Sequence, residues 1–307
     1  MVTPRGRSRG IGIALGLLAV SICACFLAVY ALSEWKLSRR YEAPLVPLRH
    51  AAKPDMAEGE RMARIVGCWD GCHGRRGEGG HEEIEGVVRH TAPTLSQVVA
   101  LYSDDELVRL IRYGVKRDGR SAVGMTSYTL WALGDQDLAN IIAHLRRQPV
   151  LPPVERKLQL TWRGRVALVT GAWKVSAEQV DRSRPQWGNL PQTTPFERGR
   201  YLASVTCSEC HGLDYLGNEL EGAPSLAIIG IYSPEQFVQL IRTARPIGGR
   251  ELNENMRWVA DAPFKDEEIT GIYQFLRTHH GFAPQPFSGS EQSGRPEVGY
   301  PQNSVSK

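Results

Sequence analysis

The chain has 307 residues, 42% of them hydrophobic, and a formal net charge of +4. Its arginines are scattered along the chain rather than gathered in one stretch, so the composition gives no support to nucleic-acid binding. Two of its six cysteines lie in an apolar run and four in two motifs that end in histidine, which leaves none for a disulfide framework.

The first predicted element is an uncharged run, Ile11–Leu32, preceded by arginines and followed by an aromatic edge that ends at Trp35. As a helix it is long enough to cross a hydrocarbon core of about 30 Å. A cleaved signal peptide has a shorter apolar core, so we expect an uncleaved transmembrane anchor. The charges on its two sides nearly balance, so its orientation, with residues 1–10 in the cytoplasm, rests on the motifs described below. Cys23 and Cys25 are expected to be ordinary apolar residues of this span, with lipid modification of Cys25 as a minor alternative.

Composition divides the remainder into further segments. Proline and mixed charges indicate a linker after the anchor, a connector in the middle, and a disordered tail rich in proline, serine and glycine. The resemblance described below implies that the connector is a partly ordered wrap over the domain surfaces without a cofactor. Two domains of about 90 residues are of normal size. The predicted divisions are a linker at 33–53, domain 1 at 54–148, a connector at 149–193, domain 2 at 194–281 and a tail at 282–307.

Two short motifs carry the chemistry: Cys68-Trp-Asp-Gly-Cys72-His73 and Cys207-Ser-Glu-Cys210-His211. The second has the C-x-x-C-H spacing of covalent c-type haem attachment, in which each thiol adds to a haem vinyl group and the histidine ligates the iron. A thioredoxin-like pair or half of a zinc site is the competing interpretation. The wide separation of the motifs and the histidine that ends each of them favour haem.

The first motif has one extra residue between its cysteines. Three alternatives stay open. Haem attaches through both cysteines with a looser loop, it attaches through Cys72 alone, or it attaches inefficiently. His73 can ligate iron in each case.

The motifs lie in an internal repeat. We match Glu60-Arg61 ahead of the first motif with Glu197-Arg198 ahead of the second. Further matches follow each motif: Ala92-Pro-Thr-Leu95 with Ala223-Pro-Ser-Leu226, the segment Ser103–Arg112 with Ser233–Arg242, Asp118-Gly-Arg120 with Gly248-Gly-Arg250, and Met125 with Met256. Each half ends in an amphipathic run, Asp135–Arg147 in the first and Asp266–Arg277 in the second. Two copies of one unit are therefore expected.

Helix signals agree with this division. Apolar residues recur at helical spacing around Leu107 and again around Phe237. Ser103 with Glu106 forms a predicted capping box, and Pro234 is expected at a first helical position. We predict no strand-rich region inside either half.

This pattern resembles the class I cytochrome c domain over roughly Pro54–Gln148 and Thr194–Gly281. The resemblance implies an all-α fold, in which an N-terminal helix leads into the motif, further helices follow, and a loop delivers a methionine to the second axial position of the haem iron. The expected architecture is thus an N-terminal transmembrane helix followed by two such domains in tandem.

The resemblance also implies the ligands of two covalently bound haem c groups. The covalent positions are Cys68, Cys72, Cys207 and Cys210, and the axial iron ligands are His73, Met125, His211 and Met256. Rivals for the methionines are His81, His90 and His279, the last expected to face solvent. Met62, which precedes the first motif, is expected to contribute to helix packing. Methionine–histidine ligation raises the reduction potential. Because both axial positions are filled, we predict electron transfer and no catalytic residue.

The leading hypothesis is a dihaem electron carrier on the bacterial inner membrane, with its haem domains in the periplasm, where this class of protein acquires haem. Its expected donor is a quinol-oxidising complex or a dehydrogenase, and its acceptor a terminal oxidase or a soluble cytochrome. The alternative is a haem enzyme, of the dihaem peroxidase or thiosulfate-oxidising type, with one open or unusually ligated iron. A redox or gas sensor is disfavoured, since only ten residues precede the anchor.

Overall fold

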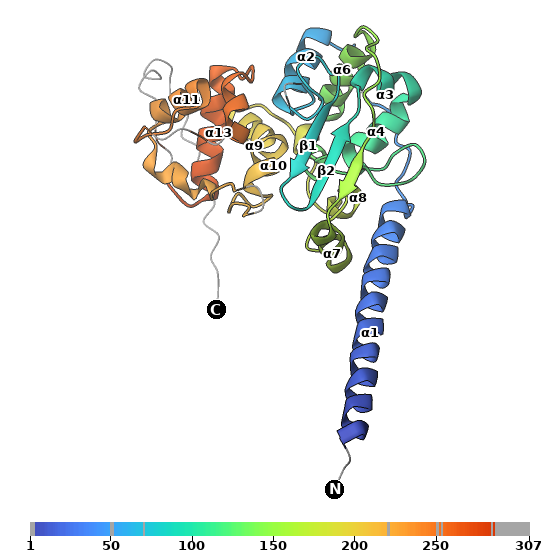
Figure 1. Cartoon of the computed structure of the whole chain (residues 1–307). Helices are drawn as coiled ribbons and strands as arrows, with labels where there is room; N and C mark the ends of the chain where they lie inside the picture. Colours follow the sequence, from blue (N-terminus) through green and yellow to red (C-terminus); the bar gives the residue numbers. More distant parts are fainter. Residues whose placement is uncertain are drawn as a thin grey trace, which may run out of the picture.

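A long N-terminal helix, α1 (Pro4–Ser38), projects from a mostly helical body in the computed structural model of the chain (Figure 1). The structure describes residues 4–49, 52–69, 71–219, 222–249, 252, 254–283 and 285. Asp70, Arg250 and nearly all of the predicted tail lie outside these residues.

Helix α1 meets the expectation of a segment able to span a membrane. Its part from Ile11 to Ser38 is long and apolar enough to do so by length and composition. Its apolar side chains are exposed almost throughout, and Cys23 and Cys25 are exposed and unpaired. The helix continues past the predicted end at Leu32, and Ser33 is already buried against the body.

Both halves contain the predicted helices. The first half comprises α2 (Met56–Ile65), α3 (Leu95–Leu101), α4 (Asp104–Tyr113), α5 (Ser127–Leu130) and α6 (Asp135–Arg146). The second comprises α9 (Pro195–Val205), α10 (Cys207–His211), η2 (Leu226–Ile231), α11 (Pro234–Thr243), α12 (Glu254–Arg257), η3 (Trp258–Ala260) and α13 (Asp266–His279). The connector forms β3 (Leu158–Leu160), α7 (Trp162–Thr170), α8 (Ser176–Gln179) and η1 (Trp187–Asn189).

The predicted helix starts are confirmed. Ser103 and Glu106 form a reciprocal capping box at α4, and Ser233 forms the matching box at α11 with Pro234 in the first turn. Each box satisfies backbone N–H groups that would otherwise lack partners.

An arginine clamp recurs in both halves. Arg112 on α4 donates to the Leu133 carbonyl and pairs with Asp135, both at 2.6 Å. Arg242 on α11 donates to the Phe264 carbonyl at 2.7 Å and pairs with Asp266 at 2.6 Å. Since the aspartates open α6 and α13, each clamp fixes the middle helix against the start of the closing helix, and the duplication extends to side-chain contacts.

Glycine permits the close crossing of the first and last helices in each half. A Cβ atom on Gly59 of α2 would lie 2.1 Å from the Asn140 carbonyl oxygen of α6. A Cβ atom on Gly199 of α9 would lie 1.9 Å from the Gly271 carbonyl carbon of α13. These contacts match Gly59 with Gly199, so the match of Glu60-Arg61 with Glu197-Arg198 is wrong by three residues.

A small antiparallel sheet corrects the all-α prediction. Strands β1 (Gly80–Ile84) and β2 (Val88–Ala92) form a hairpin in the first half, and β3 of the connector pairs with β2. Burial alternates along β1 and β2, and Gly86 adopts the positive φ of 68° that the turn requires. The strands are too short for their alternation to stand out in the sequence, and β3 comes from a distant segment.

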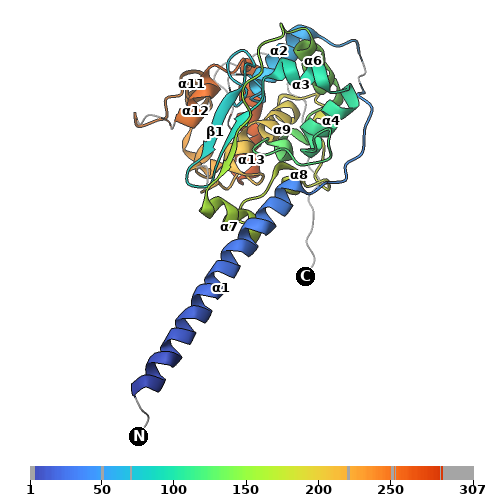
Figure 2. The ribbon, with the colours of Figure 1, turned by 45° about the vertical axis from the view of Figure 1, so that its right-hand side comes forward.

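The two halves lie side by side and share one continuous hydrophobic core (Figures 1 and 2). Met62 and Ile65 of α2, together with Tyr201 and Leu202 of α9, are fully buried in it. Met62 is therefore a packing residue, as expected. A second, smaller core lies under the hairpin and contains Leu168 of α7 and Trp173.

Candidate functional site

The second motif forms one helical turn. Helix α10 begins at Cys207 directly after α9 and ends at His211, whose side chain is largely buried. A helical turn places the two cysteines on one side and carries the histidine to the position that follows them. The local fold therefore presents all three side chains together.

The first motif is not a regular helix. Helix α2 ends at Ile65, Gly67 turns the chain with φ 72°, and the Cys68 amide N–H donates to the Ala63 carbonyl at 2.9 Å. The described residues on either side of Asp70, Cys68-Trp69 and Gly71-Cys72-His73, form bends and turns rather than a helix. The three attachment alternatives stay open.

The two motif histidines make the same hydrogen bond. Nδ1 of His73 lies 2.7 Å from the Pro93 carbonyl oxygen, and Nδ1 of His211 lies 2.7 Å from the Pro224 carbonyl oxygen. A carbonyl only accepts, so Nδ1 carries the proton in both rings. Burial lowers the pKa of both histidines against the opposing effect of the carbonyl, which favours the neutral ring.

In a neutral histidine ring that carries its proton on Nδ1, the Nε2 atom has a lone pair available for a ligand, and this applies to His73 and His211. Such an orientation by a carbonyl acceptor is typical of metal-ligating histidines. Nε2 of His211 is buried and has no hydrogen-bond partner within the described part of the chain. An unsatisfied buried acceptor is costly unless a ligand satisfies it, so this histidine fits an axial iron ligand.

Three of the motif thiols, those of Cys68, Cys72 and Cys207, are poorly suited to act as thiolates. Burial first, and then the Glu209 carboxylate, raise the pKa of Cys68 to about 12. Burial, followed by Glu82 and Glu209, raises the pKa of Cys72 to about 12, and burial alone does the same for Cys207. A thioredoxin-like pair needs a lowered thiol pKa, and zinc binds the thiolate. In the described residues no three His, Cys, Asp or Glu side chains are grouped to hold a metal ion.

Both predicted methionine ligands pack against the shared core. Met125 lies in the loop before α5, as predicted, and Met256 lies in the short helix α12. Cys68 and Cys207 contact the same core, and all four side chains are partly buried. The structure thus places one methionine and one motif cysteine of each half against the same apolar core.

The rival histidines have different positions. His81 and His279 are exposed, and His279 bonds to the Asp214 carbonyl, in line with the expected solvent-facing position. His90 on β2 is only 8% exposed, and its Nδ1 atom is buried with no hydrogen-bond partner in the described residues. Its Nε2 atom lies 2.0 Å from where a Cβ atom on Gly124 would be.

His90 therefore lies beside the loop that carries Met125. Burial lowers its pKa, and the nearby His73 lowers it further. Its buried ring therefore lies close to both His73 and the loop of Met125.

The two motifs are neighbours in space. Thr206, which precedes the second motif, donates to the Ile65 carbonyl that precedes the first, at 3.3 Å. The Tyr128 hydroxyl donates to the Glu209 carbonyl of the second motif at 2.9 Å. The influence of Glu209 on both thiols of the first motif agrees with this proximity.

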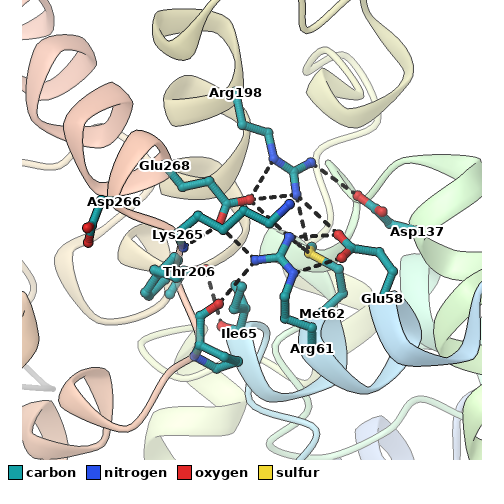
Figure 3. A network of polar contacts seen from close by, with 12 residues as sticks. Glu58, Arg61, Met62, Ile65, Asp137, Arg198, Thr206, Lys265, Asp266 and Glu268 are labelled. Atoms are coloured by element: carbon teal, nitrogen blue, oxygen red, sulfur yellow. Dashed lines mark hydrogen bonds and ion pairs between the residues drawn. The ribbon is translucent and has the colours of Figure 1, made fainter.

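An ionic network fixes the halves against each other (Figure 3). Glu268 of α13 is 2% exposed and accepts from Arg61 of α2 and from Arg198 of α9, at 2.7 and 3.0 Å. Arg61 also pairs with Glu58 at 2.7 Å, and Arg198 with Asp137 of α6 at 3.5 Å. Burial raises the pKa of Glu268, but the arginines outweigh burial and hold it below its usual range. A charged Glu268 therefore joins three helices from both halves.

Sequence reasoning found the cysteines and histidines but missed their supports. Pro93 and Pro224 were matched as parts of a repeat, and the repeated Ala-Pro-x-Leu pattern was the signal that pointed to a shared role. Comparison of the chain with models of protein families and with curated proteins found no match.

Proposed function

We propose that this chain is a membrane-anchored dihaem c-type cytochrome that transfers single electrons. The observation that carries the proposal is the equivalent hydrogen bond of His73 to Pro93 and of His211 to Pro224, each at 2.7 Å. It shows that two motifs of unequal length orient their final histidines alike. A haem c bound at each motif would supply an iron that changes reversibly between the ferric and ferrous states.

The residues of the chain take separate roles in this proposal. Cys68 and Cys72 in the first half, and Cys207 and Cys210 in the second, would form the thioether bonds. The raised thiol pKa of Cys68, Cys72 and Cys207 does not oppose this role, because a thioether carries no charge. His73 and His211 would be the proximal ligands, neutral and pre-oriented. Met125 and Met256 would be the distal ligands, which raise the reduction potential relative to a second imidazole.

The contact between the motifs supports electron exchange between the halves. Tunnelling rates fall steeply with distance, and the Thr206–Ile65 and Tyr128–Glu209 hydrogen bonds keep the two attachment segments adjacent. The shared core and the Glu268 network hold this geometry rigid. The chain would thus act as one two-centre relay rather than as two independent carriers.

The proposed location follows from α1 and from the site of c-type haem attachment. Helix α1 would anchor the chain in the bacterial inner membrane, with both halves in the periplasm. The donor would be a quinol-oxidising complex or a dehydrogenase, and the acceptor a terminal oxidase or a soluble cytochrome.

A haem enzyme is the second candidate, and the first half carries the observations that favour it. The irregular Cys68–Cys72 segment and the buried His90 beside the Met125 loop distinguish this half from the second. An iron there with an open or exchangeable position would bind small ligands such as peroxide.

Haem stoichiometry tests the proposal. The full chain would be produced with a c-type haem maturation system and its covalent haem measured per polypeptide. We expect two haems, one after Cys207→Ala with Cys210→Ala, and one after Cys68→Ala with Cys72→Ala. Cys23→Ala with Cys25→Ala is the matched control and should keep both haems.

The haem spectrum separates the two candidate functions. Two low-spin haems that ignore carbon monoxide support the electron carrier, whereas carbon monoxide binding at the first site supports the enzyme. No covalent haem in the parent chain would refute both.

A further inference from the structure

Helix α7 of the connector packs beside the upper part of α1 (Figure 2). The Trp162 ring contacts the Phe26 ring of α1, with centroids 4.5 Å apart. Further up both helices, Arg165 donates to Ser33 at 2.6 Å and Lys36 donates to the Leu168 carbonyl at 2.8 Å. The contacts advance in the same order along both helices, so the N-terminus of α7 points toward the apolar part of α1.

The depth of Trp162 follows from its neighbour on α1. Phe26 precedes Leu32, the last residue of the uncharged run, by six residues. At about 1.5 Å per residue, Phe26 lies about 9 Å inside the apolar end of the helix. A bilayer that surrounds Ile11–Leu32 therefore reaches the level of Trp162.

The outward face of α7 has the composition of a membrane interface. Trp162 and Val166 are 41% and 38% exposed, and Val169 continues the same face. The opposite face is fixed to the body, since Leu168 is fully buried and a Cβ atom on Gly164 would lie 2.0 Å from the Val87 carbonyl oxygen. Tryptophan is enriched at membrane interfaces.

The charges of α7 agree with an interfacial position. Its sequence contains two arginines and no acidic residue. Arg165 is held by α1, where it stacks 4.3 Å from the Tyr30 ring centroid and pairs with Glu34 at 2.7 Å. Arg163 is exposed beside Trp162, where its long side chain can reach lipid headgroups.

We propose that α7 is a second membrane-contacting element, inserted by its Trp162 end into the outer-leaflet interface beside α1. The occupant of the Trp162–Val166 face is the lipid bilayer, because this face continues the apolar surface of α1. The hairpin of the first half rests on α7 through Thr161, which donates to the Gly86 carbonyl at 2.7 Å. The first half is therefore the one held at the membrane. This inference rests on the proposed anchoring by α1.

Thiol accessibility in a bilayer tests this inference. The full haem-loaded chain, with Cys23→Ala and Cys25→Ala, would be placed singly in nanodiscs of phosphatidylethanolamine and phosphatidylglycerol. Single cysteines would be introduced at Val166, at Leu18 in the middle of α1, and at exposed Glu267 on α13. The rate of reaction with a membrane-impermeant maleimide is the measurement, on variants that retain the parental haem content.

We expect Val166→Cys to react at least about tenfold more slowly than Glu267→Cys, which corresponds to about 1.4 kcal/mol of shielding. A Val166→Cys rate equal to that of Glu267→Cys, with Leu18→Cys protected, would overturn the inference and leave the anchor intact. A reactive Leu18→Cys would overturn both, while the haem content tests the cytochrome proposal separately.

Discussion

The two halves hold their motif histidines by the same proline carbonyl contact but surround the motifs differently. In the second half, α10 is a single helical turn directly after α9. In the first half, the described residues of the motif form no helix, and the β1–β2 hairpin, paired with the connector strand β3, follows the motif in the chain. The carbonyl acceptor that orients the histidine is therefore common to both halves, whereas the secondary structure around the motif differs between them.

The difference also places a buried nitrogen donor in the first half. His90 is carried by β2, an element of the hairpin that the second half lacks in its described residues. We therefore expect the two halves to differ in the chemistry of their distal positions while sharing their proximal one.

Removal of the distal methionines is the strongest test of that difference. Met256→Ala should leave the second haem high-spin and open to carbon monoxide. Met125→Ala should leave the first haem low-spin with a lowered potential, because the neutral imidazole of His90 lies beside the same loop and two imidazoles favour ferric iron. Absorption and electron paramagnetic resonance spectra measure both.

The matched control is Met125→Ala combined with His90→Ala, which should bind carbon monoxide as Met256→Ala does. Equal carbon monoxide binding by the two single methionine variants would contradict a ligand role for His90.

Loss of the charge on Glu268 should have the next largest effect. Glu268→Gln leaves Arg61 and Arg198 with fewer partners at the interface of the halves. Breaking a buried ion pair costs about 3 to 5 kcal/mol, and the partial exposure of both arginines puts the expected loss of unfolding free energy at about 3 kcal/mol at neutral pH. Denaturant unfolding of the haem-loaded protein measures it, with exposed Glu267→Gln as the control.

The same variant predicts a pH dependence. The folded-state pKa of Glu268 is below the ordinary glutamate value of 4.5, so the unfolded chain takes up this proton first on acidification. The stabilisation is complete above that ordinary value and is lost as the pH falls through the folded-state pKa. The parent should therefore converge in stability on Glu268→Gln in acid. A difference that does not shrink would contradict the assignment.

The helix crossings provide a comparison of nearly equal sites. Gly199→Ala places Cβ at 1.9, 2.2 and 2.3 Å from three backbone atoms of α13, whereas Gly59→Ala meets two backbone atoms of α6 at 2.1 and 2.5 Å. Overpacking costs typically about 1 to 3 kcal/mol, and we expect the Gly199 variant at the upper end. Thermal unfolding measures both. Gly16→Ala on α1, with nothing within 4 Å, should leave the body unchanged.

The features that the sequence predicted correctly depend on local patterns. The capping boxes at Ser103 and Ser233, the closing helices from Asp135 and Asp266, and the loop position of Met125 all follow from residues within a few positions of one another. The Cys-Cys-His motifs are also local patterns, and their role in haem attachment stays a prediction.

The features that were missed depend on contacts between distant segments. The hairpin gains a strand from the connector, and the Glu268 network joins three helices from both halves. The histidines bond to the backbone carbonyls of Pro93 and Pro224. Any residue has a backbone carbonyl, so residue type alone does not predict this contact, and only the repeated Ala-Pro-x-Leu pattern points to it. The two Glu-Arg pairs were matched because their side chains are the same in both halves. The helix crossing instead requires glycine, and this aligns Gly59 with Gly199.

The smallest expected effect concerns the hydrogen bond between the motif regions. Tyr128→Phe removes the donor to the Glu209 carbonyl, and a neutral hydrogen bond contributes about 1 kcal/mol. Haem content should be unchanged, since the ring still fills its place. Tyr102→Phe is the matched control, because its hydroxyl accepts from the Arg117 amide inside the first half at 3.3 Å.

Combination of Tyr128→Phe with Thr206→Val completes a double-mutant cycle across the two hydrogen bonds. If both hydrogen bonds hold one interface, the two losses should deviate from additivity by at least about 0.5 kcal/mol. Strict additivity would mean that the two hydrogen bonds contribute independently and do not form one coupled interface.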